Sequence, residues 1–399
     1  MSNDTQPEIR FPGFTDEWEQ RKLGELATIV RGASPRPIQD PKWFDTESDV
    51  GWLRIADVTE QDGRIYYLEQ HISKLGQEKT RVLVEPHLLL SIAATVGKPV
   101  VNYVKTGVHD GFLIFLNAIF DREFMFQWLE MFRPKWQKYG QPGSQVNLNS
   151  ELVRNQEILI PNNEEQQKIG SFFKQLDNTI ALHQRKLDLL KETKKGFLQK
   201  MFPKNGAKVP EIRFPGFTKD WEERKLGDVF SERSERSSEG ELISVTINSG
   251  VIKASELDRK DNSSDNKSNY KKVEVGDIAY NSMRMWQGAS GYSSYEGILS
   301  PAYTVIIPKE GTDSKFFAYD FKRYDMIQTF KRNSQGLTSD TWNLKFPTLK
   351  LVKIMVPSIE EQKQIAAFFE RLDNTIALHE RELDVLKETK KGFLQKMFV

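Results

Sequence analysis

The sequence of 399 residues contains no cysteine, which excludes disulfide bonds, thiolate nucleophiles and zinc sites built on cysteine. It also has no run of 18 apolar residues, so no segment predicts a transmembrane helix. Residues 1–10 lack the apolar core of a signal peptide. We therefore expect a cytoplasmic protein that does not contact a membrane.

The sequence also lacks an excess of charge of either sign. Its 57 Lys and Arg residues are balanced by 56 Asp and Glu residues, which gives a net charge of +1. A protein that holds DNA by itself usually presents a basic surface, since neutralising phosphates supplies much of the affinity. The sequence therefore predicts either that DNA is not the partner or that other subunits supply much of the positive surface.

Motifs for catalysis are missing too. The sequence has no phosphate-binding P-loop, no glycine-rich turn that opens a helix for a nucleotide cofactor, and no metalloprotease motif. It has no Pro-Pro dipeptide, so the Asn/Asp-Pro-Pro-aromatic motif of adenine methyltransferases is absent. Its five histidines are scattered and form no metal-binding pattern. We therefore expect a chain that is not an enzyme and binds no cofactor or metal.

What is present is an internal repeat. Residues 176–202 recur at 372–398 with three changes, and residues 7–24 recur at 210–227. The stretches between these copies show almost no similarity to each other. Core packing alone would let the outer faces of two helices diverge, so we expect a partner to bind both copies of the repeated helix.

The repeat divides the chain into two variable blocks, each preceded by a repeated leading segment and followed by a long helix. The predicted parts are a first domain at 1–160, a first spacer helix at 161–203, a second domain at 204–356 and a second spacer helix at 357–399.

Each long helix begins with a capping signal, Asn162 with Glu165 and Ser358 with Glu361. Apolar residues then recur every three or four positions, which is typical of a coiled-coil seam. The predicted seam of the two copies comprises Phe173, Leu176, Ile180, His183, Leu187, Leu190, Lys194, Phe197 and Met201, and Phe369, Leu372, Ile376, His379, Leu383, Leu386, Lys390, Phe393 and Met397.

The connectivity predicts how these helices pair. The first helix leads from the first block to the leading segment of the second block. By the symmetry of the repeat, the second helix should lead from the second block to a place beside the leading segment of the first. The helices should then run antiparallel about a pseudo-twofold axis, with His183 close to His379. We interpret the two histidines as tolerated polar seam residues in preference to a metal site.

The variable blocks predict mixed α/β domains. In the first, residues 51–58 alternate like a strand, 82–104 predict successive strands and 120–136 an amphipathic helix. In the second, 273–308 is rich in strands and 314–332 predicts a helix. The blocks therefore share a predicted fold. Four aromatic residues of the first helix are expected in the core and not stacked on bases: Phe124, Phe126, Trp128 and Trp136.

Several motifs together resemble one family. They are the helix starts EEQQKI and EEQKQI, the helices LDNTIALH…LKETKKGFLQKMF, and the leading segments FPGF-x-x-x-W-x-x-x-KLG. The blocks add WLRIADV and TVGKPVV in the first, and GDIAYNSMRMWQGASGY and SPAYTV in the second. In this order, over nearly the whole chain, they resemble the specificity subunit of a type I restriction-modification system.

The resemblance implies a function. Each block would be a target recognition domain that reads one half of a bipartite, asymmetric sequence in double-stranded DNA, and the paired helices would set the spacer length. The repeated parts would bind two modification subunits, which use S-adenosylmethionine to methylate adenine N6. Restriction subunits would use ATP and magnesium to translocate and cut unmodified DNA. The partners would also supply the missing positive surface.

Polar residues in the block loops are candidate base contacts, because Arg can bind guanine, Asn or Gln adenine, and Ser or Thr either base. For each, the alternative is an ordinary solvated loop residue. The candidates are Arg36, Thr95, Lys98, Ser144 and Gln145 in the first block, and Asn281, Arg284, Gln287, Ser334, Gln335 and Thr338 in the second.

Other interpretations stay open at this point. Lysines of the long helices, such as Lys191, Lys194, Lys195 and Lys200, either form a solvated face or bind the partner or spacer phosphates. The chain as a whole could instead be a scaffold whose two domains bind proteins. An autonomous nuclease is disfavoured by the missing motifs.

Overall fold

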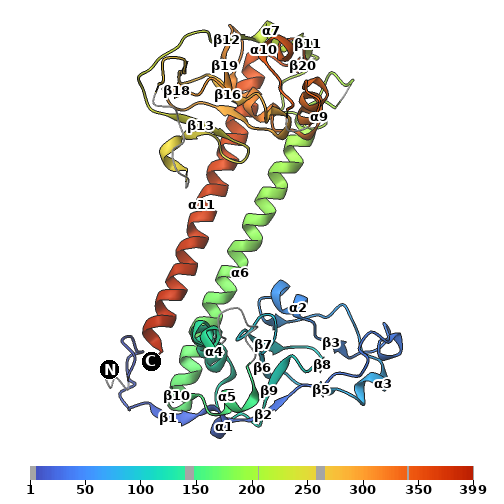
Figure 1. The fold of residues 1–399 in the computed structure, drawn as a ribbon, viewed down its shortest axis with the longest axis vertical. Coiled ribbons are helices and arrows are strands. Elements are labelled where there is room, and N and C mark those ends of the chain that lie inside the picture. Colours follow the sequence, from blue (N-terminus) through green and yellow to red (C-terminus); the bar gives the residue numbers. More distant parts are fainter. Residues whose placement is uncertain (1–5, 140–147, 205, 258–265, 339–340, 399) are drawn as a thin grey trace. The chain divides into compact units, whose positions relative to one another are not determined.

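The computed structural model describes residues 6–139, 148–204, 206–257, 266–338 and 341–398. The chain divides into two compact units, residues 1–184 with 381–399, and residues 185–380. Each unit thus combines one variable block with parts of both long helices, α6 (Asn163–Lys200) and α11 (Ile359–Met397) (Figure 1). The sequence-based boundaries at 160, 203 and 356 stay predictions.

The first unit is built on a five-stranded sheet of order β2-β9-β6-β7-β4. Its pairs are antiparallel, except that β4 runs parallel to β7. Strands β6 and β9 are nearly continuous apolar runs because both faces of the sheet are covered. The bounds are β2 Thr28–Arg31, β4 Arg64–Ile65, β6 Leu88–Ser91, β7 Pro99–Asn102 and β9 Phe112–Leu116.

Smaller elements complete this unit. A three-stranded sheet has the order β3-β8-β5, and β1 pairs with β10. The strands are β1 Glu19–Lys22, β3 Gly51–Trp52, β5 Arg81–Leu83, β8 Thr106–Val108 and β10 Glu157–Ile160. The helices are α1 Leu23–Leu26, η1 Pro41–Trp43, α2 Ile55–Glu60, α3 Lys74–Gln77, α4 Arg122–Trp136, η2 Gln137–Tyr139 and α5 Ser150–Arg154.

The second unit repeats the central sheet as β12-β19-β16-β17, all antiparallel. Its strands are β11 Glu222–Lys225, β12 Phe230–Glu232, β13 Ile243–Thr246, β14 Gly250–Lys253, β15 Lys271–Val273, β16 Ile278–Asn281, β17 Ser290–Tyr292, β18 Gly297–Leu299, β19 Tyr303–Pro308 and β20 Lys353–Val356. Its helices are α7 Leu226–Val229, η3 Ala254–Glu256, η4 Met285–Gln287, α8 Ser314–Asp320, α9 Tyr324–Asn333 and α10 Phe346–Leu349.

The mixed α/β fold class and the shared fold of the two blocks are confirmed. The strands predicted in 82–104 and 273–308 are present, and the helix predicted at 120–136 is α4. Its four aromatic residues are all buried, as expected for the core.

Two predicted elements were wrong. Residues 51–58 form a two-residue strand and then helix α2, because the Asp57 carboxylate accepts the backbone N–H of Arg54 at 2.8 Å and caps that helix. The single helix predicted at 314–332 is broken into α8 and α9, with Arg323 in an extended conformation between them. The capping carboxylates predicted for the long helices also differ, because Glu165 binds Arg10 instead of its own helix start.

Within each unit the segments of α6 and α11 run antiparallel, as predicted. In the first unit the rings of Phe172 and Phe393 lie 5.2 Å apart and Asp177 binds Lys390 at 2.6 Å. Residue numbers rise along one helix as they fall along the other. In the second unit Lys194 binds Asp373 at 2.5 Å and the rings of Phe197 and Phe368 lie 5.0 Å apart, which gives the same direction.

All the predicted seam residues of both helices are buried or half-buried. His183 belongs to the first unit and His379 to the second, so their approach stays a prediction.

Candidate nucleic-acid interface

The central sheets of the two units carry irregular loops at the same end. In the first unit this end carries the loops 32–40, 92–98 and 109–111, which follow β2, β6 and β8. In the second unit it carries the loop 282–289, which follows β16 in the equivalent position of the sheet. Loops on a rigid scaffold are common sites of binding residues, and all the candidates between β6 and β7 or β16 and β17 lie here.

Hydrogen bonds hold the three loops of the first unit together. The backbone N–H of Ile92 donates to the carbonyl of Gly111 at 2.9 Å, and that of Gly32 donates to Phe112 at 2.9 Å. Arg36 forms an ion pair with Asp110 at 2.6 Å, yet 74% of its side chain is exposed. The structure thus brings the candidate Arg36 to the same edge as Thr95. Candidates Ser144 and Gln145 lie outside the described residues.

Lys98 is engaged in a different way. Its ammonium lies 2.5 Å from both the Asp62 and the Glu130 carboxylates, and only 12% of its side chain is exposed. Burial alone would lower the pKa of Lys98, but the two carboxylates raise it. These ion pairs fix the end of the 92–98 loop, so Lys98 is less available for an outside partner than Arg36.

A hollow of about 270 Å³, which no sequence motif predicted, lies beside Arg36. His109 lines it together with Ser34, Trp52 and Arg54. The Nδ1 atom of His109 lies 2.9 Å from the backbone N–H of Gly111, which donates to it, and burial lowers the pKa of the ring. The histidine is therefore neutral near pH 7, with Nε2 as its N–H donor.

In the second unit the structure joins two loops that are far apart in the sequence. The backbone N–H of Leu344 donates to the carbonyl of Ser282 at 2.8 Å, and the rings of Trp286 and Trp342 lie 5.2 Å apart. Residues Gln335 and Asn343 exchange two backbone hydrogen bonds. The loop 282–289 and the described residues of the loop 334–344 therefore form one surface. Five candidates lie on these loops and the sixth ends strand β16 beside them: Arg284, Gln287, Ser334, Gln335 and Thr338, and Asn281.

The six candidates differ in how far their side chains are used inside the protein. Asn281 Oδ1, Ser334 Oγ and Thr338 Oγ1 form local hydrogen bonds with the backbone or a neighbouring hydroxyl. Among the described residues, the side chains of Arg284 and Gln287 make no hydrogen bond or ion pair, and both are half-buried. Their side-chain donors are therefore unused within the described part of the chain.

Aromatic and basic residues next to these candidates were not predicted. Lys331 on α9 places its ammonium 5.7 Å from the ring of Trp342, and Trp286 Nε1 donates to the carbonyl of Met283 at 3.0 Å. The first contact ties Trp342 to α9, and the second fixes Trp286 within its own loop. The sequence signal that could have found them is the occurrence of one tryptophan in each of two loops rich in polar residues.

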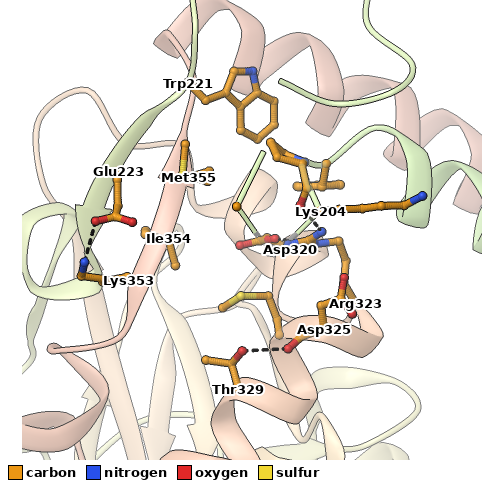
Figure 2. A pocket seen from close by; sticks show the side chains of 14 residues that line it. Lys204, Trp221, Glu223, Asp320, Arg323, Asp325, Thr329, Lys353, Ile354 and Met355 are labelled. Carbon is orange, nitrogen blue, oxygen red and sulfur yellow. Dashed lines mark hydrogen bonds and ion pairs between the residues drawn. The ribbon is translucent and has the colours of Figure 1, made fainter. Parts of the chain in front are cut away.

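A separate hollow of about 170 Å³ lies where the C-terminal end of α6 enters the second unit. Figure 2 shows Asp320 and Arg323 pointing toward each other in it, below Trp221. Their ion pair measures 2.7 Å, and Glu223 and Lys353 form another at 2.7 Å. Because these charges are paired with one another, we interpret this hollow as part of the joint between helix and domain.

The repeated parts build the same contacts in both units. Arg10 of the first leading segment binds Glu165 at 2.6 Å, and Arg213 of the second binds Glu361 at 2.7 Å. The two carboxylates are at most 1% exposed. The leading segments are thus fixed to the starts of the long helices by buried ion pairs.

Apolar residues also remain exposed at equivalent positions of the long helices. The first unit exposes Leu182 by 58% and Val385 by 64%, and the second unit exposes Leu189 by 67% and Leu378 by 53%. Leu182 and Leu378 correspond in the repeat, as do Leu189 and Val385. The two units thus expose apolar side chains at the same two positions of the repeat.

No described helix is both long and apolar enough to span a membrane. The model of the type I restriction modification DNA specificity domain matches the chain twice, over residues 15–192 and 218–388. Two curated proteins of Methanocaldococcus jannaschii are similar over most of their length. The specificity subunit of the type I restriction enzyme MjaVIII is 23% identical, covering 97% of this chain and 92% of the relative. The putative MjaX specificity subunit is 22% identical, covering 95% and 92%.

Solved structures show the same fold. The S subunit of a type I restriction-modification system from M. genitalium has a TM-score of 0.62 at 13% identity and covers 99% of both chains. A chain from a structural study of complex assembly and conformational transition in a type I system has a TM-score of 0.53 at 16% identity, covering 98% of this chain and 99% of that one. Since the family model covers most of both halves, the chain belongs to the type I restriction-modification specificity subunits, the non-catalytic DNA-recognition component of these systems.

Proposed function

We propose that each variable domain reads one half of a bipartite, asymmetric DNA target through the loops at the shared end of its central sheet. The observation that carries this proposal is the surface formed by loops 282–289 and 334–344, where Arg284 and Gln287 offer unused donors. Arginine and glutamine are the side chains that read guanine and adenine in the major groove. In the first domain, Arg36 and Thr95 occupy the equivalent end of the sheet.

The paired long helices, on this proposal, fix the spacer between the two half-targets and bind two modification subunits. The equivalent exposed residues of the two helices, such as Leu182 and Leu378, support a repeated partner, because a surface present twice suits two copies of one protein. The buried pairs of Arg10 and Arg213 fix the leading segments beside the same helices.

The chemistry would belong to the partners. The modification subunits would bind S-adenosylmethionine and methylate adenine N6, and restriction subunits would use ATP and magnesium to translocate and cut unmodified DNA. The net charge of +1 agrees with this division, because a chain that shares its DNA with larger partners does not need to supply all the positive surface.

Co-expression with the modification subunit, followed by sequencing of methylated adenines, tests the proposal. We expect one bipartite motif with a fixed spacer. Replacing residues 228–356 by the corresponding block of another specificity subunit should change one half of the motif and leave the other half and the spacer unchanged. Methylation that is independent of this block, or its absence in the presence of a bound modification subunit, would contradict the proposal and favour a protein-binding scaffold.

A further inference from the structure

A second hollow in the second unit carries three lysines. It has a volume of about 280 Å³ and lies among the α6, α8 and α11 helices, the β13–β14 turn and strand β17. Lys194 comes from α6, Lys315 from α8, and Lys322 from the turn between α8 and α9. Cations gathered from separate elements indicate a site for a negatively charged group.

Lys322 is held in place without a negative partner. Its Nζ atom donates to the carbonyl of Ile247 at 2.8 Å and to that of Gly288 at 2.6 Å. An ammonium has three N–H donors, so one remains for a ligand. Burial, together with the neighbouring Lys194, lowers the pKa of Lys322 to about 8, which is the response of a cation that lacks a compensating charge.

The other two lysines are paired. Lys194 binds Asp373 at 2.5 Å, and Lys315 binds Glu370 at 2.6 Å. Three cations therefore meet two carboxylates in the lining of the hollow, and one positive charge is left over. A single bound anion would balance it.

A hydroxyl group completes the lining. Ser290 is fully buried, and its Oγ atom has no hydrogen-bond partner among the described residues. A buried polar group without a partner is costly, and Ser290 belongs to the residues that line this hollow. A ligand with acceptor oxygens would satisfy both this hydroxyl and the free donor of Lys322.

The hollow lies between the loop that reads bases and the helix that spans the spacer. Gly288, whose carbonyl Lys322 binds, belongs to the loop 282–289, and Lys194 belongs to α6. If the loop binds DNA bases, the DNA backbone that continues toward the spacer passes this hollow. We propose that the hollow binds one backbone phosphate of the DNA, at the border between the second half-target and the spacer, an inference that rests on the proposed function.

The test is the salt dependence of DNA binding by the complex with modification subunits. Each phosphate neutralised contributes about 0.9 to the slope of log K against log salt. We expect Lys322→Met or Lys194→Met to lower the slope by about one or less, equally for target and unrelated DNA. Between about 50 and 200 mM salt, the variants should lose about threefold less affinity than the unchanged protein does.

The double variant sharpens the test. Because both lysines act on one phosphate, Lys194→Met with Lys322→Met should lower the slope by about one in total. A fall of about two, or no fall in either single variant, overturns the single-phosphate site. Lys353→Met is the control, because Lys353 lies in β20 of the same unit, has a side chain 66% exposed and pairs with Glu223; its slope should equal that of the unchanged protein. An equal fall in this control also overturns the site.

Two further measurements separate other causes. Calorimetry with inorganic phosphate and the DNA-free complex distinguishes a free anion: micromolar binding that the double variant abolishes would assign the hollow to a soluble ligand and overturn the proposal. The same DNA titrations compare target with unrelated sequence. If the unchanged protein binds target and unrelated DNA with equal affinity, the proposed function is wrong. If the variants keep the preference for target DNA and the salt slope is unchanged, only the phosphate site is wrong.

Discussion

Arg284 offers the most direct test of base recognition. Its guanidinium makes no hydrogen bond or ion pair with the described residues, so Arg284→Ala removes no ionic or hydrogen-bonding interaction from the folded chain. We therefore expect the free energy of unfolding to change by no more than about 0.5 kcal/mol. Any larger effect on DNA binding then reports on the contact with DNA.

The magnitude follows from the contact that the geometry allows. A bidentate arginine on guanine contributes about 1–3 kcal/mol of discrimination, which corresponds to a loss of about 5- to 160-fold in target affinity. The loss should be confined to targets that carry the guanine. Binding to unrelated DNA should weaken little, because a base contact adds little to sequence-independent affinity.

The assay is methylation mapping combined with affinity measurements on targets changed at one position. For Arg284→Ala we expect one position of one half-target to become degenerate, with the spacer and the other half unchanged. Arg332→Ala is a suitable control, because Arg332 is an exposed arginine of α9 near the same surface that donates to Thr329 at 3.0 Å. An unchanged motif in the Arg284 variant, or degeneracy in both variants, would refute the assignment.

Three more outcomes can be measured. Arg10→Met should lower the free energy of unfolding by about 3–5 kcal/mol in chemical denaturation, because it leaves the fully buried Glu165 carboxylate unpaired; an unchanged midpoint would contradict this. Leu182→Glu with Leu378→Glu should leave the melting temperature unchanged and abolish co-purification of the modification subunit; retained binding would exclude this surface. Burial lowers the pKa of His109, so its contribution to stability is complete above about pH 6.5 and lost as the pH falls toward the lowered pKa; thermal midpoints between pH 8 and 5 should fall less for His109→Gln, and identical curves would exclude the effect.

The long helices were predictable because their signals are local. A seam with a period of 3.5 and a cap at Asn162 specify a helix from neighbouring residues alone, and the Asn162 side chain does accept the backbone N–H of Glu165 at 3.0 Å. What the local signal could not show is the partner of the Glu165 carboxylate. Arg10 lies 155 positions earlier and outcompetes the helix start for it.

The break between α8 and α9 has a similar cause. No glycine or proline interrupts residues 314–332, so the sequence predicts one helix. In the structure, Arg323 leaves the helical conformation, binds the buried Asp320 at 2.7 Å and places its guanidinium 4.8 Å from the ring of Phe202. Phe202 follows the end of α6, more than a hundred residues earlier, and no local pattern contains that contact.

The candidate base contacts show the same limit. Residue type and loop position were enough to nominate Arg284 and Lys98 alike. The structure separates them, because Lys98 binds Asp62 and Glu130 whereas Arg284 has no partner among the described residues. Which polar loop residue is available for DNA depends on the distant carboxylates that fold beside it.

The two units attach their domains to the long helices in the same way, although their loops differ. In the first unit Phe398 lies 5.3 Å from Phe124 and 5.8 Å from Phe173, measured between ring centroids. In the second unit, the ring of Phe202 lies 5.2 Å from that of Phe316 and 6.2 Å from that of Phe369 on α11.

Identical residues therefore hold each domain to the long helices at the end of its sheet opposite the loops 92–98 and 282–289. Because that joint fixes the orientation of the sheet, the loops at the other end can differ in length and sequence without disturbing it. On the proposed function, this separation lets the recognised bases change while the surface for the modification subunits stays the same.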